Sequence, residues 1–292
     1  MQTVHQLDQD TWAGPFAAET CREAVAALER GGVLYLPQLA FVLEKRERSL
    51  FSSNLSDSKA KNITLDPASG TLQGGDLDDA ADALLRGMLQ RFSDAATQLA
   101  AGLLPDYAGR IERARTTYRP VEIAGRSYSP KKDDKLLHVD TFPSRPARGR
   151  RILRLFANIN PAGQSRLWHV GEEFEAYAKR FLPGLRAQYP FEAAALALLG
   201  ITKGRRSAYD TLMLGLHDTG KLDAAYQKDA PFAAVAFPPG STWLCYTDQV
   251  LHAALEGQFA LEQTFHLDVA AMAEPARSPL KVLERMTGRA LV

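Results

Sequence analysis

The sequence predicts an α+β fold in which a double-stranded β-helix, a jelly roll of the cupin type, forms a core flanked by helices. Helical periodicity dominates the N-terminal part, and strand-like alternation surrounds a His-x-Asp triplet near the middle of the chain. A helical stretch then separates this region from a second group of strand-like segments that contains a late histidine. We expect one domain with a mainly helical part at 1–112, a β-helix core at 113–270 with a helical insertion at about 170–231, and a tail at 271–292.

The composition is typical of a soluble globular protein, because 46% of the 292 residues are hydrophobic and 24% are charged. A net charge of +1 argues against a general nucleic-acid binder, so we expect no nucleic-acid partner. No apolar run reaches the roughly 18 residues of a transmembrane span, and the N-terminus lacks a signal-peptide pattern. Cys21 and Cys245 lie far apart in the sequence, which favours a reducing compartment over a disulfide framework. We therefore expect a cytoplasmic protein.

The N-terminal part alternates between helical and extended patterns. The first helix has apolar side chains at helical spacing and ends at Gly31 and Gly32. The last helix of this part begins with acidic residues, which the helix dipole favours at that end. Between them, a polar and glycine-rich stretch indicates a loop. We predict helix at 17–30, strand at 33–37, helix at about 41–52, loop at 54–76 and helix at 76–105.

Strand character appears at 114–123 and resumes at 136–142, the segment LLHVDTF. This segment carries His138 and Asp140, and side chains two residues apart in a strand leave the same face. His-x-Asp triplets are common by chance, but a further histidine, His252, follows 114 residues after His138 and opens another predicted strand. Two imidazoles and one carboxylate form the facial triad that binds non-haem Fe(II) and leaves three coordination positions open. We predict that these three residues are the metal ligands and the catalytic centre of an oxygenase that uses 2-oxoglutarate and O2.

The next segment, RRILRLFANINP, alternates strictly between two kinds of side chain. If this were an edge strand, its mixed face would lie in water. If it lay inside a small-molecule barrel, its mixed face would place a guanidinium and an amide beside the His-x-Asp pair. The apolar face consists of Leu153, Leu155, Ala157 and Ile159, and the mixed face of Ile152, Arg154, Phe156 and Asn158.

A 2-oxoglutarate oxygenase also needs a cation for the distal carboxylate, and the planar guanidinium of arginine fits it best. The stretch Ala253–Val269 contains no arginine or lysine, so the cation must come from another strand. We choose Arg154 first, because the alternation sets its face, and Arg119 second, either for 2-oxoglutarate or for an anionic substrate. The remaining predicted pocket residues are Asn158, Trp243, Thr264 and His266.

The second half of the chain mixes helices and strands. A helical stretch at 170–200 is interrupted at Pro183, and another helix is predicted at about 207–217. This helix carries His217, which we interpret as a structural or surface histidine. The last strand is predicted at 259–267, and a helix with Pro279 near its beginning is predicted in the tail.

Three segments carry a resemblance to a known family: LLHVDTFPSRPARGRRILRLFANINP, GRRSAYDTLMLGLHD and TWLCYTDQVLHAALEGQFALEQTFHL. From about residue 118 to 269 the chain resembles the Kdo hydroxylases, Fe(II)/2-oxoglutarate/O2-dependent dioxygenases of Gram-negative bacteria. The resemblance implies hydroxylation at C3 of Kdo (3-deoxy-D-manno-oct-2-ulosonic acid) attached to lipid A, giving Ko, succinate and CO2. It also implies metal ligands at His138, Asp140 and His252, and 2-oxoglutarate or pocket arginines at Arg154 and Arg119.

A lipid-bearing acceptor would bring the protein to the cytoplasmic face of the inner membrane as a peripheral partner, without a span. Arginines gathered near the predicted mouth suit the Kdo carboxylate and the lipid A phosphates, although each could instead belong to a solvated loop. Ascorbate is expected to help turnover in vitro, and the sequence predicts no oligomeric state. These arginines are Arg145, Arg148, Arg150 and Arg151.

Two alternatives stay open at this point. The protein could be a 2-oxoglutarate oxygenase that acts on another small molecule or on a protein side chain, which only a substrate screen distinguishes. It could also be a cupin-like sugar-binding module without turnover, although such a module has no need of three open iron positions. A visible charge-transfer band on anaerobic addition of Fe(II) and 2-oxoglutarate would separate the oxygenase from the module.

Overall fold

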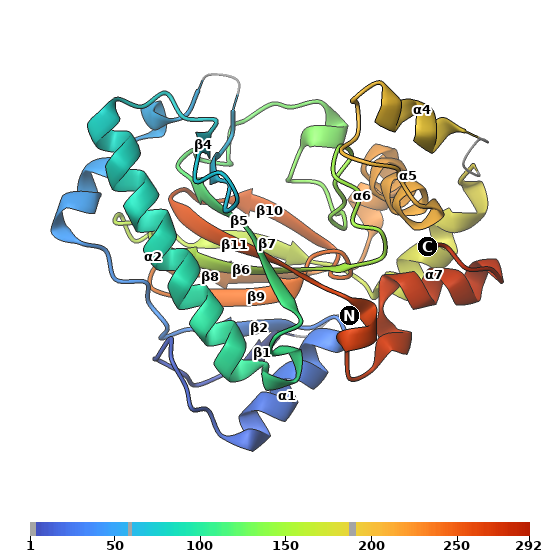
Figure 1. The fold of residues 1–292 in the computed structure, drawn as a ribbon, viewed down its shortest axis with the longest axis horizontal. Coiled ribbons are helices and arrows are strands. Elements are labelled where there is room, and N and C mark those ends of the chain that lie inside the picture. The colour runs from blue at the N-terminus through green and yellow to red at the C-terminus, as the bar shows by residue number, and fades with distance from the viewer. Residues whose placement is uncertain (1–3, 58–59, 187–190) are drawn as a thin grey trace.

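The computed structural model describes residues 4–57, 60–186 and 191–292, which form two β-sheets flanked by helices (Figure 1). Every pair of strands is antiparallel except the parallel pair β1–β2 among the described residues. The larger sheet has the order β1 (Val4–Gln6), β2 (Val33–Leu36), β9 (Thr242–Tyr246), β6 (Arg151–Asn158), β11 (Ala260–Leu267), β5 (Ile111–Arg119), β3 (Ile63–Leu65) and β4 (Leu72–Gln73). The smaller sheet has the order β10 (His252–Glu256), β7 (Arg166–Val170) and β8 (Ala233–Phe237).

The two sheets face each other across an aromatic cluster. The ring of Phe156 on β6 lies 5.0 Å from that of Trp168 on β7, and Trp243 on β9 lies 5.6 Å from Trp168. Phe237 stacks on Trp243 at 4.1 Å and closes this end of the inter-sheet space. Because neighbouring side chains of a strand point to opposite faces, these aromatics occupy the inner faces. The predicted double-stranded β-helix core is confirmed.

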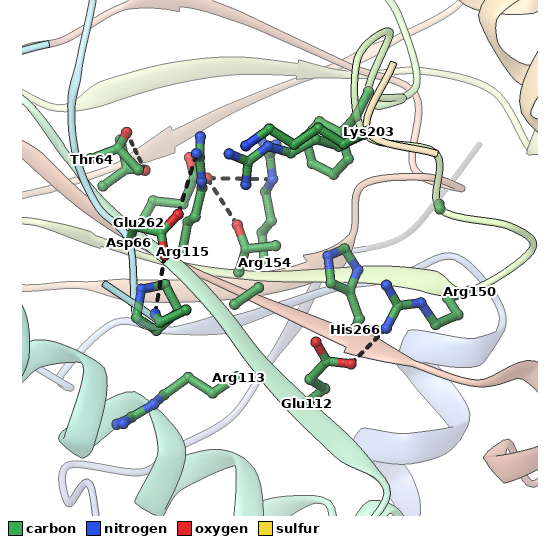
Figure 2. A pocket seen from close by; sticks show the side chains of 18 of the residues that line it. Thr64, Asp66, Glu112, Arg113, Arg115, Arg150, Arg154, Lys203, Glu262 and His266 are labelled. Atoms are coloured by element: carbon green, nitrogen blue, oxygen red, sulfur yellow. Dashed lines mark hydrogen bonds and ion pairs between the residues drawn. The ribbon is translucent and has the colours of Figure 1, made fainter. Parts of the chain in front are cut away.

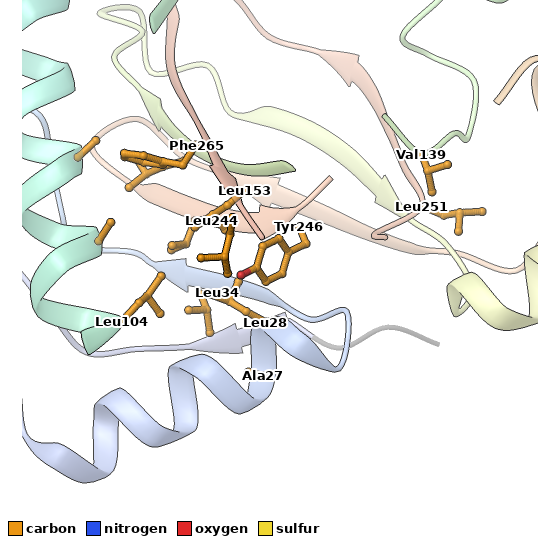
Figure 3. Close-up of a cluster of buried hydrophobic side chains, with 14 of the residues drawn as sticks. Ala27, Leu28, Leu34, Leu104, Val139, Leu153, Leu244, Tyr246, Leu251 and Phe265 are labelled. Carbon is orange, nitrogen blue, oxygen red and sulfur yellow. The ribbon is translucent and has the colours of Figure 1, made fainter. Parts of the chain in front are cut away.

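Helices cover the outer face of the larger sheet. Figure 3 shows Leu153 of β6 and Leu244 of β9 in a cluster that also includes Leu28 of α1 (Ala18–Glu29) and Leu104, which follows α2 (Asp79–Leu103). The Asp78 side chain accepts a hydrogen bond from Ala81 N at 2.8 Å and caps α2, as acidic residues at a helix start do. The predicted alternation of RRILRLFANINP therefore holds, with its apolar face toward the helices and its mixed face toward the smaller sheet.

A second group of helices lies beside the sheets (Figure 1). Four of its members follow β7 and precede β8, where the sequence predicts a helical insertion, and the fifth begins with Pro279 as predicted for the tail. The helices are α3 (Phe174–Phe181), α4 (Glu192–Leu198), α5 (Ala208–Leu222), α6 (Ala224–Asp229) and α7 (Pro279–Thr287). Within the described ranges, no helix is both long and apolar enough to span a bilayer.

Several local predictions are wrong. The expected loop at 54–76 contains β3 and β4, and the expected helix at 41–52 is only a 3₁₀ turn at Lys45–Leu50. The LLHVDTF segment is extended but forms only an isolated bridge rather than a strand. Strands of two or three residues carry little periodicity of their own, so pairing with β5 rather than local sequence fixes β3.

Candidate metal centre and the cleft beside it

The metal-ligand candidates are brought together by backbone pairing. His138 N donates to His252 O at 3.1 Å, and His252 N donates back to His138 O at 2.9 Å. Asp140 N donates to Thr247 O at 2.7 Å, which fixes the third residue against the turn before β10. The extended segment around His138 thus lies along the start of β10 and directs both histidines into the space between the sheets.

The three side chains form a metal-binding geometry. Their ligand atoms all lie within 4.8 Å of one another, and within the described part of the chain they are the only such group found. Nε2 of His138 lies 3.7 Å from Oδ1 of Asp140, and Nε2 of His252 lies 4.0 Å from Oδ2. Each Nδ1 contacts a backbone carbonyl, of Leu136 at 2.7 Å and of Val250 at 2.8 Å. Because each Nδ1 then carries the proton, each Nε2 keeps a lone pair for a metal.

Burial and nearby charges favour the protonation states that a metal needs. Burial lowers the pKa of His138 and of His252, which favours the neutral imidazoles that a metal binds. Burial alone would raise the pKa of the Asp140 carboxyl, but the Arg154 guanidinium holds this pKa well below its usual range. Oδ2 of Asp140 is buried and has no hydrogen-bond partner of good geometry. The donor set is therefore two neutral imidazoles and one carboxylate, which fits Fe(II).

A chain of alternating charges runs from the metal centre along the inner face of the larger sheet. Arg154 Nη1 on β6 lies 3.0 Å from Asp140 Oδ2, and Arg154 Nε lies 3.4 Å from Oε1 of Glu262 on β11. Arg119 Nε on β5 donates to Oε2 of the same Glu262 at 2.9 Å. β11 lies between β5 and β6, so this buried carboxylate holds both guanidinium groups. The sequence analysis did not single out Glu262.

Arg166 on β7 is a second residue that the sequence analysis missed. It is buried, its Nη1 makes a long hydrogen bond to Gly257 O at 3.4 Å, and its Nε has no partner. Burial and the neighbouring charge of Arg119 lower the pKa of Arg166 to about 9, because no carboxylate compensates it fully. Three guanidinium groups thus lie near the carboxylates of Glu262, Asp140 and Asp134. The alternation in RLWHV, which places Arg166 on the same face as Trp168, was the available signal.

Two cavities adjoin the metal centre. A small chamber of about 50 Å³ is lined by the three ligand candidates together with Arg166 and Trp168. A cleft of about 550 Å³, shown in Figure 2, runs across the larger sheet toward β3 and β5. Two residues, Arg119 and Arg154, line both spaces and form their common wall, and Glu262, which binds both of them, lines the cleft. A ligand in the cleft therefore lies next to the metal centre.

The outer part of the cleft is rich in cations. Arg115 lies 3.6 Å from Asp66, and burial together with the charge of Arg145 lowers the pKa of Arg115. Arg150 lies 2.6 Å from Glu112 at the cleft wall. Cations outnumber carboxylates along this wall, so an anionic ligand is favoured. The outer cations are Arg113, Arg115, Arg145, Arg150 and Lys203.

Two arginines predicted at the mouth lie elsewhere. Arg151 is fully buried, donates from Nε to Asp248 Oδ2 at 2.8 Å, and lies 3.8 Å over the ring of Tyr246. The mouth position predicted for Arg151 is wrong, because β6 begins there and turns this side chain toward a buried carboxylate. Arg148 is not among the residues that line the cleft.

The other predicted pocket residues divide between the cleft and the core. Thr264 and His266 line the cleft. Asn158 donates to Phe237 O at 2.9 Å, and Trp243 packs in the aromatic cluster, so neither lines a cavity beside the metal centre. His217 packs edge-on against His138 with 5.5 Å between ring centroids and contacts Asp218, a structural position.

Comparison with known proteins agrees with this geometry. A family model described as 3-deoxy-D-manno-oct-2-ulosonic acid (Kdo) hydroxylase matches residues 11–290. The crystal structure of the Kdo hydroxylase KdoO, described as a non-heme Fe(II) α-ketoglutarate-dependent dioxygenase, in complex with α-ketoglutarate and Fe(III), shares 46% identity at a TM-score of 0.96. Its apo structure shares 47% identity at a TM-score of 0.97, and both comparisons cover 100% of this chain and 98% of the other. A search of curated proteins found no match. The chain belongs to the Kdo hydroxylase family.

Proposed function

We propose that this protein is an Fe(II)/2-oxoglutarate/O2-dependent hydroxylase that acts on Kdo attached to lipid A and converts it to Ko. One observation carries the proposal: a triad of two neutral imidazoles and one carboxylate lies at the inner end of an arginine-lined cleft. Solved relatives at 46% identity are described as complexes with Fe(III) and α-ketoglutarate or succinate, which supports the same cofactors here. α-Ketoglutarate is 2-oxoglutarate.

His138, Asp140 and His252 would hold the iron through the two Nε2 atoms and the carboxylate. Bound iron, 2-oxoglutarate and O2 would supply the oxidising chemistry, with succinate and CO2 as coproducts. The contribution of the chain is to keep these ligands deprotonated, to keep bulk water out of the buried chamber, and to direct one C–H bond toward the metal centre.

Arg166 is the best candidate for the distal carboxylate of 2-oxoglutarate. Arg154, the first choice from the sequence, forms ion pairs with Asp140 and Glu262, whereas the buried Arg166 guanidinium forms no such pair and has an unpartnered Nε. Arg166 also lines the chamber but not the outer cleft, where an acceptor would bind. A carboxylate at this guanidinium would supply the missing compensating charge.

The outer cleft suits an acidic sugar attached to phosphorylated lipid. C3 of Kdo carries no oxygen, and a hydroxylase requires such a C–H bond. Arg119 lies at the wall between chamber and cleft and would bind the sugar carboxylate, while Arg115 and Arg145 lie farther out and would bind phosphates. Binding of these remote groups would orient C3, so free Kdo would be a poor substrate. The proposed location is the cytoplasmic face of the inner membrane.

Mass spectrometry tests the proposal directly. Kdo-bearing lipid A incubated with the protein, Fe(II), ascorbate, 2-oxoglutarate and O2 is expected to gain one oxygen atom, about 16 Da, with an equal amount of succinate. A fragment spectrum should place the added oxygen on C3. Consumption of 2-oxoglutarate without a mass change on the Kdo–lipid A would contradict the acceptor. It would direct the search to another small molecule or a protein side chain.

A further inference from the structure

An exposed apolar surface lies at and beside α4, within the insertion between β7 and β8. Its four side chains are exposed to a degree that is unusual for large apolar residues. We call them the α4 patch: Phe191 (85% exposed), Leu198 (89%), Leu199 (71%) and Ile201 (54%). They fall within eleven consecutive residues of the chain, and α4 lies at the periphery of the molecule (Figure 1). Apolar side chains exposed to this degree indicate a surface that binds an apolar partner.

The α4 patch is held in shape by backbone hydrogen bonds. Leu199 N donates to Ala195 O at 3.0 Å, and Ile201 N donates to Leu196 O at 3.0 Å, which closes the C-terminal end of α4. Gly200 adopts a φ of +68° between them, the left-handed conformation that commonly ends a helix. The turn therefore presents Leu198, Leu199 and Ile201 to the outside as part of an ordered element.

The chain after the start of α4 is positively charged. Glu192 follows Phe191 in the sequence, but residues 193–209 contain Lys203, Arg205 and Arg206 and no aspartate or glutamate. Lys203 and Arg205 are exposed. A protein partner would need a matching acidic and apolar surface, whereas a bilayer that contains anionic lipids offers both features at its interface.

The same stretch is tied to the rim of the cleft. Lys203 lines the cleft, and its backbone N donates to Ser144 O at 2.8 Å. The Arg206 guanidinium donates to Pro143 O. Ser144 and Pro143 lie between Phe142 and Arg145, two further residues of the cleft lining. The apolar surface, the basic residues and the cleft mouth therefore form one continuous region.

We propose that the α4 patch and its basic flank dock the protein on an anionic lipid bilayer, with the cleft mouth facing the headgroups. This inference rests on the proposed function, because a sugar that remains attached to a membrane lipid reaches the metal centre only if the cleft opens at the bilayer surface. Docking in this orientation leaves the acyl chains of the acceptor in the membrane, while its anionic head extends along the arginines toward the triad.

Vesicle flotation of the full-length protein, without any acceptor, tests the docking. Wild-type protein is expected to bind vesicles of phosphatidylcholine and phosphatidylglycerol more tightly than vesicles of phosphatidylcholine alone. Combined Leu198→Ser and Leu199→Ser substitutions should lower the affinity for the anionic vesicles by about tenfold or more. Arg205→Gln should lower it by several-fold, and only for the anionic vesicles. Val42→Ser is the matched control, because Val42 is 77% exposed outside the patch.

Equal vesicle binding by wild-type protein, the double leucine variant and Val42→Ser would overturn the proposal, as would no binding by wild-type protein. A dimer that the leucine substitutions dissociate, without a change in vesicle binding, would assign the patch to a second copy of the chain instead. Binding of Fe(II) and 2-oxoglutarate should be unchanged in every variant. The vesicles carry no acceptor, so patch-dependent binding with no hydroxylation of Kdo–lipid A would retain the docking and reject the acceptor. Hydroxylation of detergent-dispersed acceptor without patch-dependent vesicle binding would retain the acceptor and reject the docking.

Discussion

Arg154 Nη1 lies 3.0 Å from Oδ2 of Asp140, so a guanidinium of the larger sheet contacts the carboxylate of the candidate metal centre. The same side chain contacts Glu262, which also holds Arg119. Arg154 therefore supports Asp140, a proposed metal ligand, as much as it contributes to any anion site. A substitution of Arg154 should therefore affect metal binding as well as anion binding.

Arg154→Ala is expected to weaken both Fe(II) and 2-oxoglutarate binding, because Asp140 loses its charged neighbour and Glu262 is left with one partner. Arg166→Ala should weaken 2-oxoglutarate binding about a hundredfold, or ~3 kcal/mol, while it leaves Fe(II) affinity near normal. Titration of each variant with Fe(II) and then with 2-oxoglutarate measures both constants. Arg166→Lys serves as the control and should recover part of the affinity. Loss of 2-oxoglutarate affinity in Arg154→Ala alone would return the anchor to Arg154.

The metal centre can be tested apart from turnover with Co(II), which a structure of the related KdoO contains. Replacement of His138, Asp140 or His252 by Ala should abolish hydroxylation and lower the affinity for Co(II), followed by its visible absorption, since each substitution removes one of three donors. His217→Ala is the control, because this ring lies beside His138 but contributes no ligand atom to the group. Near-normal activity and metal binding in Asp140→Ala would contradict the triad.

Acceptor recognition should depend on the outer cleft. Arg115→Gln combined with Arg145→Gln is expected to raise the KM for Kdo–lipid A by at least about tenfold, because two cations that suit phosphate are removed. The KM for 2-oxoglutarate should stay constant, since neither residue lines the inner chamber. Arg22→Gln, on the exposed side of α1, controls for the loss of positive charge. An equal change in both KM values would assign the two arginines a general structural role.

Glu29 provides a test of the fold away from the metal centre. Its buried carboxyl group accepts hydrogen bonds from Tyr107 Oη at 2.8 Å, Ala273 N at 2.8 Å and Glu274 N at 2.6 Å, and so ties α1 to the C-terminal segment. Glu29→Ala should lower the free energy of unfolding by about 3 kcal/mol, because three donors lose their acceptor. Urea denaturation measures this change, and Glu23→Ala, at an exposed position of the same helix, should have little effect. A similar loss in both variants would argue against the network.

Periodicity and spacing predicted the elements whose pattern of apolar and polar residues repeats over several turns or residues. The helices α1, α2 and α7, the alternation of β6 and the convergence of His138, Asp140 and His252 all follow from local sequence. The two-residue strand β4 and the three-residue strand β3 did not, because their position depends on β5, a partner distant in the sequence. Local patterns carry no information of that kind.

The partners and orientations of the arginines could be predicted from the sequence only in part. Alternation correctly placed Arg154 inside the β-helix, but it could not show that Asp140 and Glu262 would bind this side chain. Arg166 shows the same alternation, but its strand β7 has only five residues. The strand ends where the predicted helical stretch begins, so the short alternating pattern was not recognised. Arg151 belongs to a dense group of arginines near the predicted mouth, but β6 begins at this residue and its side chain is buried away from the cleft.

The reciprocal hydrogen bonds between His138 and His252 join residues separated by 114 positions. During synthesis the ribosome therefore releases two of the three proposed metal ligands long before the third, and helices α3 to α6 emerge in between. A nascent chain that ends before His252 offers iron only one imidazole and one carboxylate, too few for the facial triad. If these residues bind iron as we propose, stable iron capture at this triad waits until β10 has been made and His252 has paired with His138.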